Sequence, residues 1–182
     1  RRLSQSGPAT PDHVLRTKPL PMLGFDVQAY ARRYRDYFEY HAERAEEKKT
    51  MLDPAPRMVL DATLGFAAAG RTARDAAIIE ELYDHTIDVI LRAESLGGWQ
   101  AVDQRDIFDI EYWDLEQAKL RKASAPPLFT GEVVLVTGAA SGIGKACVDA
   151  FLRSGAAVVG LDRNVVIETM WVRADFTGIA CD

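Results

Sequence analysis

Residues 132–144 read EVVLVTGAASGIG, and this stretch decides the fold of the last third of the chain. Its apolar run, Glu132–Thr137, is typical of a strand that is buried on both faces of a parallel sheet. A glycine-rich turn, a helical pattern over 142–154 and a second apolar run over 157–161 follow. A strand, a helix and a strand within about thirty residues make a βαβ unit. We therefore predict an α/β fold, the start of a doubly wound parallel sheet, with a third strand near 178–181.

The three glycines of this turn each meet a physical requirement of a phosphate-binding turn. Gly138 lets the chain turn sharply off the strand, Gly142 lets the backbone approach a pyrophosphate, and Gly144 lets the helix pack closely on the sheet. Free N–H groups at the helix start attract the phosphate charge, and Ser141 adds a hydroxyl donor. We predict a Rossmann dinucleotide site that also includes Ile143. The alternative is a structural turn that binds no nucleotide.

Asp162 decides which dinucleotide the site prefers. It ends the second strand, at the distance from Gly144 where dinucleotide sites carry an acidic residue. A carboxylate there accepts hydrogen bonds from the ribose hydroxyls of NAD and repels the 2′-phosphate of NADP. Arg163 favours NADP instead, because a guanidinium binds that phosphate or stacks on adenine. We expect NAD, with NADP as the less favoured alternative.

The pattern TGxxxGIG at Thr137–Gly144 resembles the glycine motif of the short-chain dehydrogenase/reductase family. This resemblance implies hydride transfer between a nicotinamide cofactor and an alcohol or carbonyl. Asp182, after the third strand, resembles the family aspartate that binds the adenine amino group. The family's catalytic serine and Tyr-x-x-x-Lys pair have no counterpart, because Tyr112 precedes the motif and no lysine follows it at the required spacing. The catalytic residues stay unassigned, and we expect the chain to stop before the dehydrogenase unit is complete.

The region before the glycine motif resembles the tail of the aldolase part of bifunctional class II aldolase/short-chain dehydrogenase proteins. The matching stretches are Thr10–Val14, Arg16–Pro19, Arg71–Ala73, His85–Asp88, Asp109–Trp113 and Glu116–Leu120. The resemblance implies cleavage of a sugar phosphate, such as rhamnulose 1-phosphate, to dihydroxyacetone phosphate and lactaldehyde, and oxidation of the aldehyde to lactate. It also implies a divalent metal, zinc above all, in an upstream part of the aldolase.

The three histidines of the chain give no metal-ligand pattern. His13, His41 and His85 are too far apart in sequence for a His-x-His pair. We expect His13 in a loop, either near the aldolase site or as a capping residue, and the other two on helices. No metal ligand is therefore assigned.

Proline-rich residues 123–130 predict a linker. The linker separates a mainly helical aldolase-like domain over 1–122 from a dinucleotide-binding domain over 131–182. The first domain is expected to begin with a strand-like stretch over 12–15 and a helix that is capped by Asp26 and continues to Lys49. A strand over 57–61 and a loop or hairpin over 65–70 follow. A second helix starts at a capping box, Thr72–Asp75, and ends at Gly97-Gly98, and a third spans 109–122 and packs through Tyr112, Leu115 and Leu120.

The composition of the chain limits the classes of partner that it is expected to bind. The net charge of −5 argues against nucleic acid or an anionic membrane surface. Two isolated cysteines, Cys147 and Cys181, fit a reducing cytoplasm, and no apolar run is long enough to cross a bilayer. We expect a small-molecule substrate (an aldehyde, an alcohol or a sugar phosphate) and a homo-oligomer.

Two other functions stay open. Tyr30, Tyr34 and Tyr37 recur at helical spacing, and such a stripe packs on a core more often than it stacks a sugar ring. Long helices with aromatic faces also suit an assembly module in which the Rossmann portion is structural. The other possibility is a metal-dependent sugar-phosphate lyase whose site lies upstream.

Overall fold

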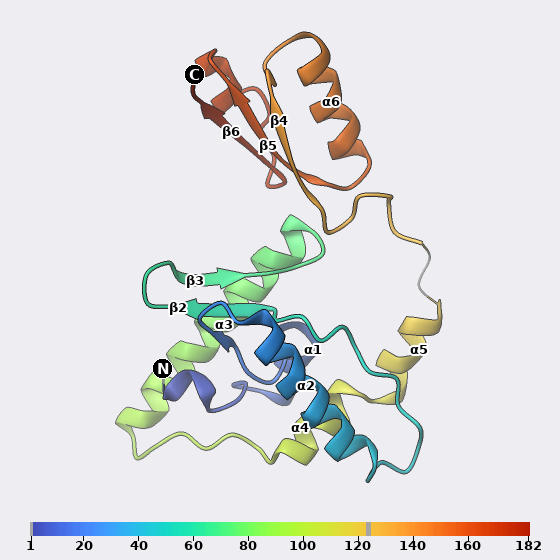
Figure 1. The fold of residues 1–182 in the computed structure, drawn as a ribbon. Helices are drawn as coiled ribbons and strands as arrows, with labels where there is room; N and C mark the ends of the chain where they lie inside the picture. Colours follow the sequence, from blue (N-terminus) through green and yellow to red (C-terminus); the bar gives the residue numbers. More distant parts are fainter. Residues whose placement is uncertain (1, 123–124) are drawn as a thin grey trace. The chain divides into compact units, whose positions relative to one another are not determined.

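The computed structural model describes residues 2–122 and 125–182, and the side chains of all of these except 119–122. Contacts divide the chain into two compact units, residues 1–69 with 77–123 and residues 70–76 with 124–182. Figure 1 labels the helices and strands of both units. Each unit is described by itself.

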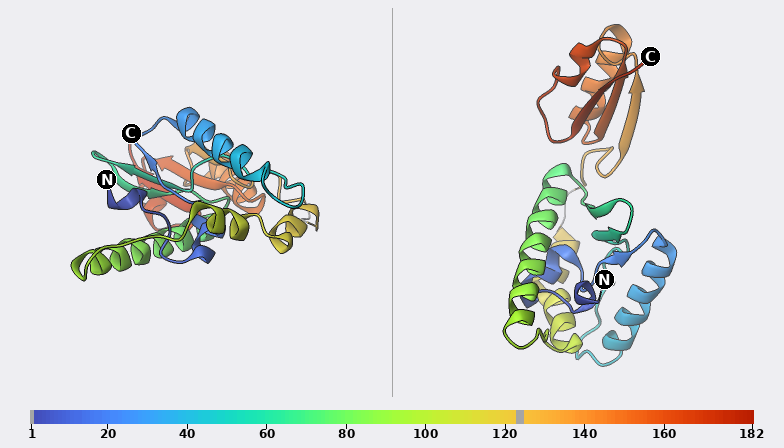
Figure 2. Two further views of the ribbon diagram at one scale, coloured as in Figure 1. Left: turned by 90° about the horizontal axis from the view of Figure 1, so that it is seen from below. Right: turned by 90° about the vertical axis from the view of Figure 1, so that its left-hand side faces the viewer.

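The second unit is a three-stranded parallel sheet with a helix on it. Its elements are β4 (Val133–Thr137), α6 (Gly142–Arg153), β5 (Ala157–Asp162), a 3₁₀ turn η3 (Val165–Glu168) and β6 (Phe176–Ala180). The strand order is β4-β5-β6, and both neighbouring pairs are parallel. This order, with α6 as the crossover between β4 and β5, is the start of a doubly wound sheet. The predicted fold class is confirmed (Figure 2).

The core of this unit lies between the sheet and α6. Val148 and Leu152 of α6 pack with Val158 of β5, and all three are buried. Along β4, Val134 and Val136 pack against this core, whereas Val133 and Leu135 are 73% and 62% exposed. The expectation that β4 is buried on both faces is therefore wrong for the described residues. Alternate side chains of a strand point to opposite faces, and α6 covers one face.

The first unit is mainly helical, as predicted. Its helices are α1 (Val14–Thr17), α2 (Val27–Ala42), α3 (Ala73–Ser95, from residue 77 onward), α4 (Gln104–Glu111) and α5 (Asp114–Lys122). A small sheet joins them, with β1 (Met22–Leu23) parallel to β2 (Met58–Asp61) and β2 antiparallel to β3 (Gly65–Ala68). The predicted strand over 57–61 is present as β2, and residues 65–68, expected in a loop or hairpin, form β3, the second strand of a hairpin. Within the described ranges, no helix is long and apolar enough to cross a membrane.

Two predicted helix starts are confirmed in atomic detail. The Ala29 N–H donates to Asp26 Oδ1 at 2.8 Å, which caps α2. The Asp75 N–H donates to Thr72 Oγ1 at 3.1 Å at the start of α3. In both cases a short polar side chain satisfies an N–H group that has no partner inside the helix. However, α2 ends at Ala42 rather than near residue 49.

Two predicted elements differ from the structure. Residues 12–15 are helical rather than strand-like, because Pro11 opens a 3₁₀ turn (Pro11–His13) that runs directly into α1. The single helix expected over 109–122 is two helices, which break at Tyr112 and Trp113. Asp103 caps the first of these by accepting from the Arg105 N–H at 2.8 Å.

Of the three side chains expected to pack in residues 109–122, the structure places one in the core and one at the surface. Tyr112 is fully buried, as predicted for a packing residue, whereas Leu115 is 60% exposed. The Leu120 side chain, like linker residues 123 and 124, lies outside the described residues.

Candidate functional site

The glycine-rich turn joins the carboxyl end of β4 to the start of α6. Gly138 and Gly142 have φ values of 62° and 51°, in the left-handed region that glycine adopts without strain. A Cβ atom added at either position would meet no atom within 4 Å. The turn is therefore tightly curved and leaves open space beside its backbone.

Gly144 is required for a different reason. A Cβ atom at this position would lie 2.1 Å from the carbonyl oxygen of Gly138 and 3.0 Å from that of Thr137. The first turn of α6 is therefore in direct backbone contact with the end of β4. The structure thus gives separate reasons for the glycines: two permit the turn, and the third permits the close approach of the helix.

Asp162 lies at the carboxyl end of β5 and is tied to the same turn. Its Oδ2 accepts a hydrogen bond from the Ala140 N–H at 2.9 Å, and its Oδ1 accepts one from the Asn164 N–H at 2.9 Å. These two bonds hold the pKa of the Asp162 carboxyl below its usual value, and the bond from Asn164 has the larger effect. Asp162 is therefore an ionised group at neutral pH with oxygen lone pairs to spare.

The remaining predicted residues surround this turn. Ser141 is the N-cap residue of α6 but makes no capping hydrogen bond through its side chain. Ile143 is 85% exposed, although it is a large apolar residue in the first turn of a helix. Asp182, beyond the end of β6, lies 3.9 Å from the Arg163 guanidinium, and both side chains are exposed.

These features fit a dinucleotide. The carboxyl ends of β4 and β5 lie at the same sheet edge, and ligands of such sheets bind in that crevice. The start of α6 offers N–H groups beside open backbone space for a phosphate. The Asp162 carboxylate lies at the carboxyl end of β5, and Ile143 offers an exposed apolar surface.

A second polar cluster, in the first unit, was not foreseen from the sequence. Tyr34 of α2 is its centre: the hydroxyl donates to Glu111 Oε1 at 2.6 Å, accepts from Lys18 Nζ at 2.6 Å and shares a hydrogen bond with the Tyr112 hydroxyl at 2.6 Å. Lys18 Nζ also lies 3.6 Å from Glu111 Oε1, and the two side chains are 6% and 1% exposed. The partners are 16, 77 and 78 residues from Tyr34, so no local pattern reveals them.

Burial dominates the electrostatics of this cluster. It lowers the pKa of Lys18 to about 8, against the opposing attraction of Glu111. It also raises the pKa of Glu111 and that of the Tyr34 hydroxyl. Lys18 has a φ of 66°, the only positive value at a non-glycine residue in the described chain. This backbone conformation carries local strain, as is common where a side chain is held by its surroundings.

The structure places two of the three histidines near each other. The rings of His13 and His85 are 6.2 Å apart, and His13 Nδ1 lies 3.2 Å from the Thr86 hydroxyl. His41 lies on α2, as expected, and its ring stacks on that of Phe108 at 5.2 Å between centroids. No group of three metal-ligating side chains occurs among the residues that the structure describes.

Known proteins match both parts of the chain. The family described as aldolase class II, second domain, matches residues 1–120, and the short chain dehydrogenase family matches residues 132–174. A curated relative, the uncharacterized oxidoreductase YuxG of Bacillus subtilis (strain 168), is 28% identical over 180 residues, which cover 90% of this chain and 26% of the relative. The chain thus spans about a quarter of the length of that relative. The chain belongs to the class II aldolase second-domain family, and the start of a short-chain dehydrogenase follows that domain.

Proposed function

We propose that the whole protein is an NAD-dependent short-chain dehydrogenase fused to a sugar-phosphate aldolase, and that this segment binds the cofactor. The observation that carries the proposal is the Gly138–Gly144 turn, which has open space beside Gly138 and Gly142 and is tied to the Asp162 carboxylate. The start of α6 would hold the pyrophosphate, and Asp162 would hold the adenosine ribose. When bound, NAD accepts a hydride from the substrate.

The substrate of the dehydrogenase follows from its aldolase partner. We propose a small hydroxy-aldehyde or alcohol of the lactaldehyde type, because an aldolase that cleaves a deoxy-sugar phosphate releases such an aldehyde. The family match over residues 1–120 supports an aldolase neighbour. A divalent metal, zinc above all, would serve the aldolase chemistry from residues other than those described here.

Titration of NADH into the full-length protein, followed by nicotinamide fluorescence, tests cofactor binding. Gly142→Trp fills the open space beside the turn and is expected to abolish binding. Gly131→Trp is the matched control: Gly131 also has a positive φ (90°) and open space around it, but it precedes β4 at the other end of the strand. Loss of binding in both variants, or in neither, contradicts the proposed site.

The preference for NAD is tested at Asp162. We expect ADP-ribose to compete with NADH at least about tenfold better than its 2′-phosphorylated form, because the carboxylate repels the phosphate. Asp162→Asn removes the charge and should largely remove this discrimination. Equal competition by the two ligands in the unsubstituted chain would refute the NAD preference while leaving nucleotide binding intact.

The aldolase part has its own test. Metal-dependent cleavage of a sugar phosphate such as rhamnulose 1-phosphate is measured by release of dihydroxyacetone phosphate in the full-length protein. The activity should be lost on chelation and regained with zinc. It should also persist in the Gly142→Trp variant, because the two reactions use separate sites.

A further inference from the structure

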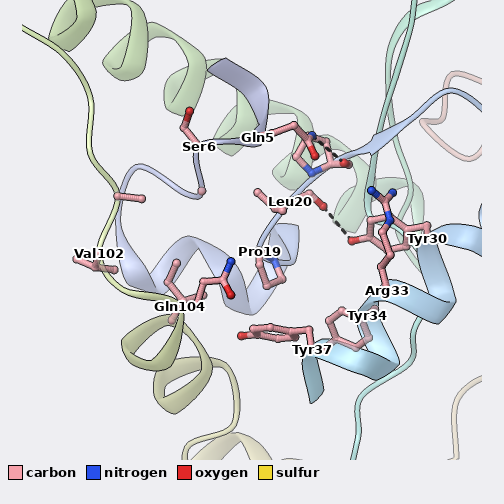
Figure 3. A pocket seen from close by; sticks show the side chains of 14 residues that line it. Gln5, Ser6, Pro19, Leu20, Tyr30, Arg33, Tyr34, Tyr37, Val102 and Gln104 are labelled. Atoms are coloured by element: carbon pink, nitrogen blue, oxygen red, sulfur yellow. Dashed lines mark hydrogen bonds between the residues drawn. The ribbon is translucent and has the colours of Figure 1, made fainter. Parts of the chain in front are cut away.

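The first unit contains a cavity of about 330 Å³, whose lining includes none of the residues of the glycine-rich turn (Figure 3). Four stretches of the chain line it: residues 5–7, residues 19–21, α2, and residues 101–107 at the start of α4. This volume lies at the small end of the range for ligand sites. It equals the liquid volume of roughly ten water molecules, so it suits a ligand of roughly ten non-hydrogen atoms.

The walls of the cavity are mostly rings and aliphatic side chains. Tyr30, Tyr34 and Tyr37 line it from α2, and Pro19 and Leu20 line it from the opposite segment. The Tyr30 hydroxyl donates to the Leu20 carbonyl at 2.9 Å, and the Tyr34 hydroxyl is held in the buried cluster with Glu111. Since both hydroxyls are engaged elsewhere, these two rings are fixed and present apolar surfaces to the cavity.

Arg33 adds a positive charge to these apolar walls. It lies on α2 between Tyr30 and Tyr34, and Figure 3 shows it at the side of the cavity. In the part of the chain that the structure describes, no carboxylate forms an ion pair with Arg33, whereas Arg57 and Arg92 each have one. A guanidinium presents a planar fork that matches a carboxylate or a phosphate. The Gln104 amide supplies a further neutral polar group.

We propose that this cavity binds a small molecule with one anionic group and an apolar or ring-shaped body, and that Arg33 holds this carboxylate or phosphate group. One cation suits one anionic group, and the tyrosine and proline walls suit an apolar body rather than a second charge. The size of the cavity limits that body to about one six-membered ring with a short side chain.

Calorimetric titration of the full chain with phenylacetate and phenylacetamide tests the proposal. The two probes have the same shape and differ in charge. We expect phenylacetate to bind about tenfold or more tightly than phenylacetamide, because only the carboxylate pairs with Arg33. Acetate and inorganic phosphate, which lack the apolar body, should bind more weakly than phenylacetate. Comparison with phenyl phosphate tells whether the cavity favours a carboxylate or a phosphate.

Two variants place the binding at this cavity. Arg33→Gln should reduce phenylacetate affinity about tenfold and remove the preference over phenylacetamide, whereas Arg32→Gln should change neither. Arg32 is the matched control, because it is the exposed neighbour on α2 and does not line the cavity. Val102→Trp, which fills the cavity from the opposite wall, should prevent binding of both probes.

A local signal distinguishes binding here from binding elsewhere. The Trp99 indole N–H donates to the carbonyl of Ser6, a lining residue, at 3.4 Å. Its NMR resonance should shift on addition of phenylacetate, whereas that of Trp171 in the second unit should not. Absence of binding, equal affinity for the two probes, or affinity unchanged in Arg33→Gln would each overturn the proposal. Arg33 is exposed, so this variant keeps the test valid even if Val102→Trp fails to fold.

Discussion

Removal of one oxygen atom, in Tyr34→Phe, should strongly destabilise the first unit. The Tyr34 hydroxyl makes three buried hydrogen bonds of 2.6 Å, two of them to the charged groups of Lys18 and Glu111. Hydrogen bonds to charged groups contribute about 1.5–3 kcal/mol each. Lys18 and Glu111 keep their 3.6 Å ion pair in the variant, so part of this energy is retained. We expect a loss of about 3 kcal/mol in the free energy of unfolding.

Two other tyrosines of α2 provide controls with the same change. Tyr30→Phe removes a single hydrogen bond to the Leu20 carbonyl and should cost about 1 kcal/mol. Tyr40 is 57% exposed, and its ring stacks under Arg44 without using the hydroxyl, so Tyr40→Phe should cost roughly nothing. The three variants keep the aromatic rings and form a graded series.

Urea unfolding followed by tryptophan fluorescence measures this series. Trp171→Phe is introduced in every protein, because Trp99 and Trp113 then report the first unit alone. The urea midpoint should be highest in Tyr40→Phe, lower in Tyr30→Phe and lowest in Tyr34→Phe. The slope of the unfolding free energy against urea concentration should be unchanged. If Tyr34→Phe costs no more than Tyr30→Phe, the hydroxyl is not the centre of a buried network and the reasoning fails.

Three further predictions concern pH and close backbone contacts. Burial lowers the pKa of Lys18 to about 8, so the folded state binds fewer protons than the unfolded state above that pH. The free energy of unfolding should therefore rise between about pH 8 and about pH 10, compared with that of Lys18→Met. Equal pH profiles of the two proteins in urea titrations would contradict this. Gly178→Ala places a Cβ atom 2.0 Å from the Ile167 carbonyl oxygen and should lower the thermal midpoint of the second unit by several degrees, whereas Gly131→Ala, in open space, should lower it much less. Gly144→Ala should weaken NADH binding more than about tenfold in fluorescence titration, because the start of α6 must move away from Gly138; unchanged affinity would show that this close approach is not needed.

The sequence by itself determined the features that depend on neighbouring residues. A βαβ unit follows from two apolar runs and a glycine-rich turn, because backbone sterics allow few residues other than glycine at Gly138 and Gly142. Asp26 and Thr72 mark helix starts for a similar reason, since each satisfies an N–H group within its own turn. Short stretches such as residues 12–15 are predicted poorly from sequence, because so few residues fit a strand or a helical turn equally well.

Only the tertiary structure decided which distant residues meet. The hydroxyl of Tyr34 bonds to Glu111 and Tyr112, 77 and 78 residues away, and the Arg33 cavity needs four separate stretches of chain. The exposed side chains of β4 are a further case, because the apolar run looked the same whether one face or both were covered. Hydrophobic patterning reports that a side chain is apolar, and the packing of other elements determines what it touches.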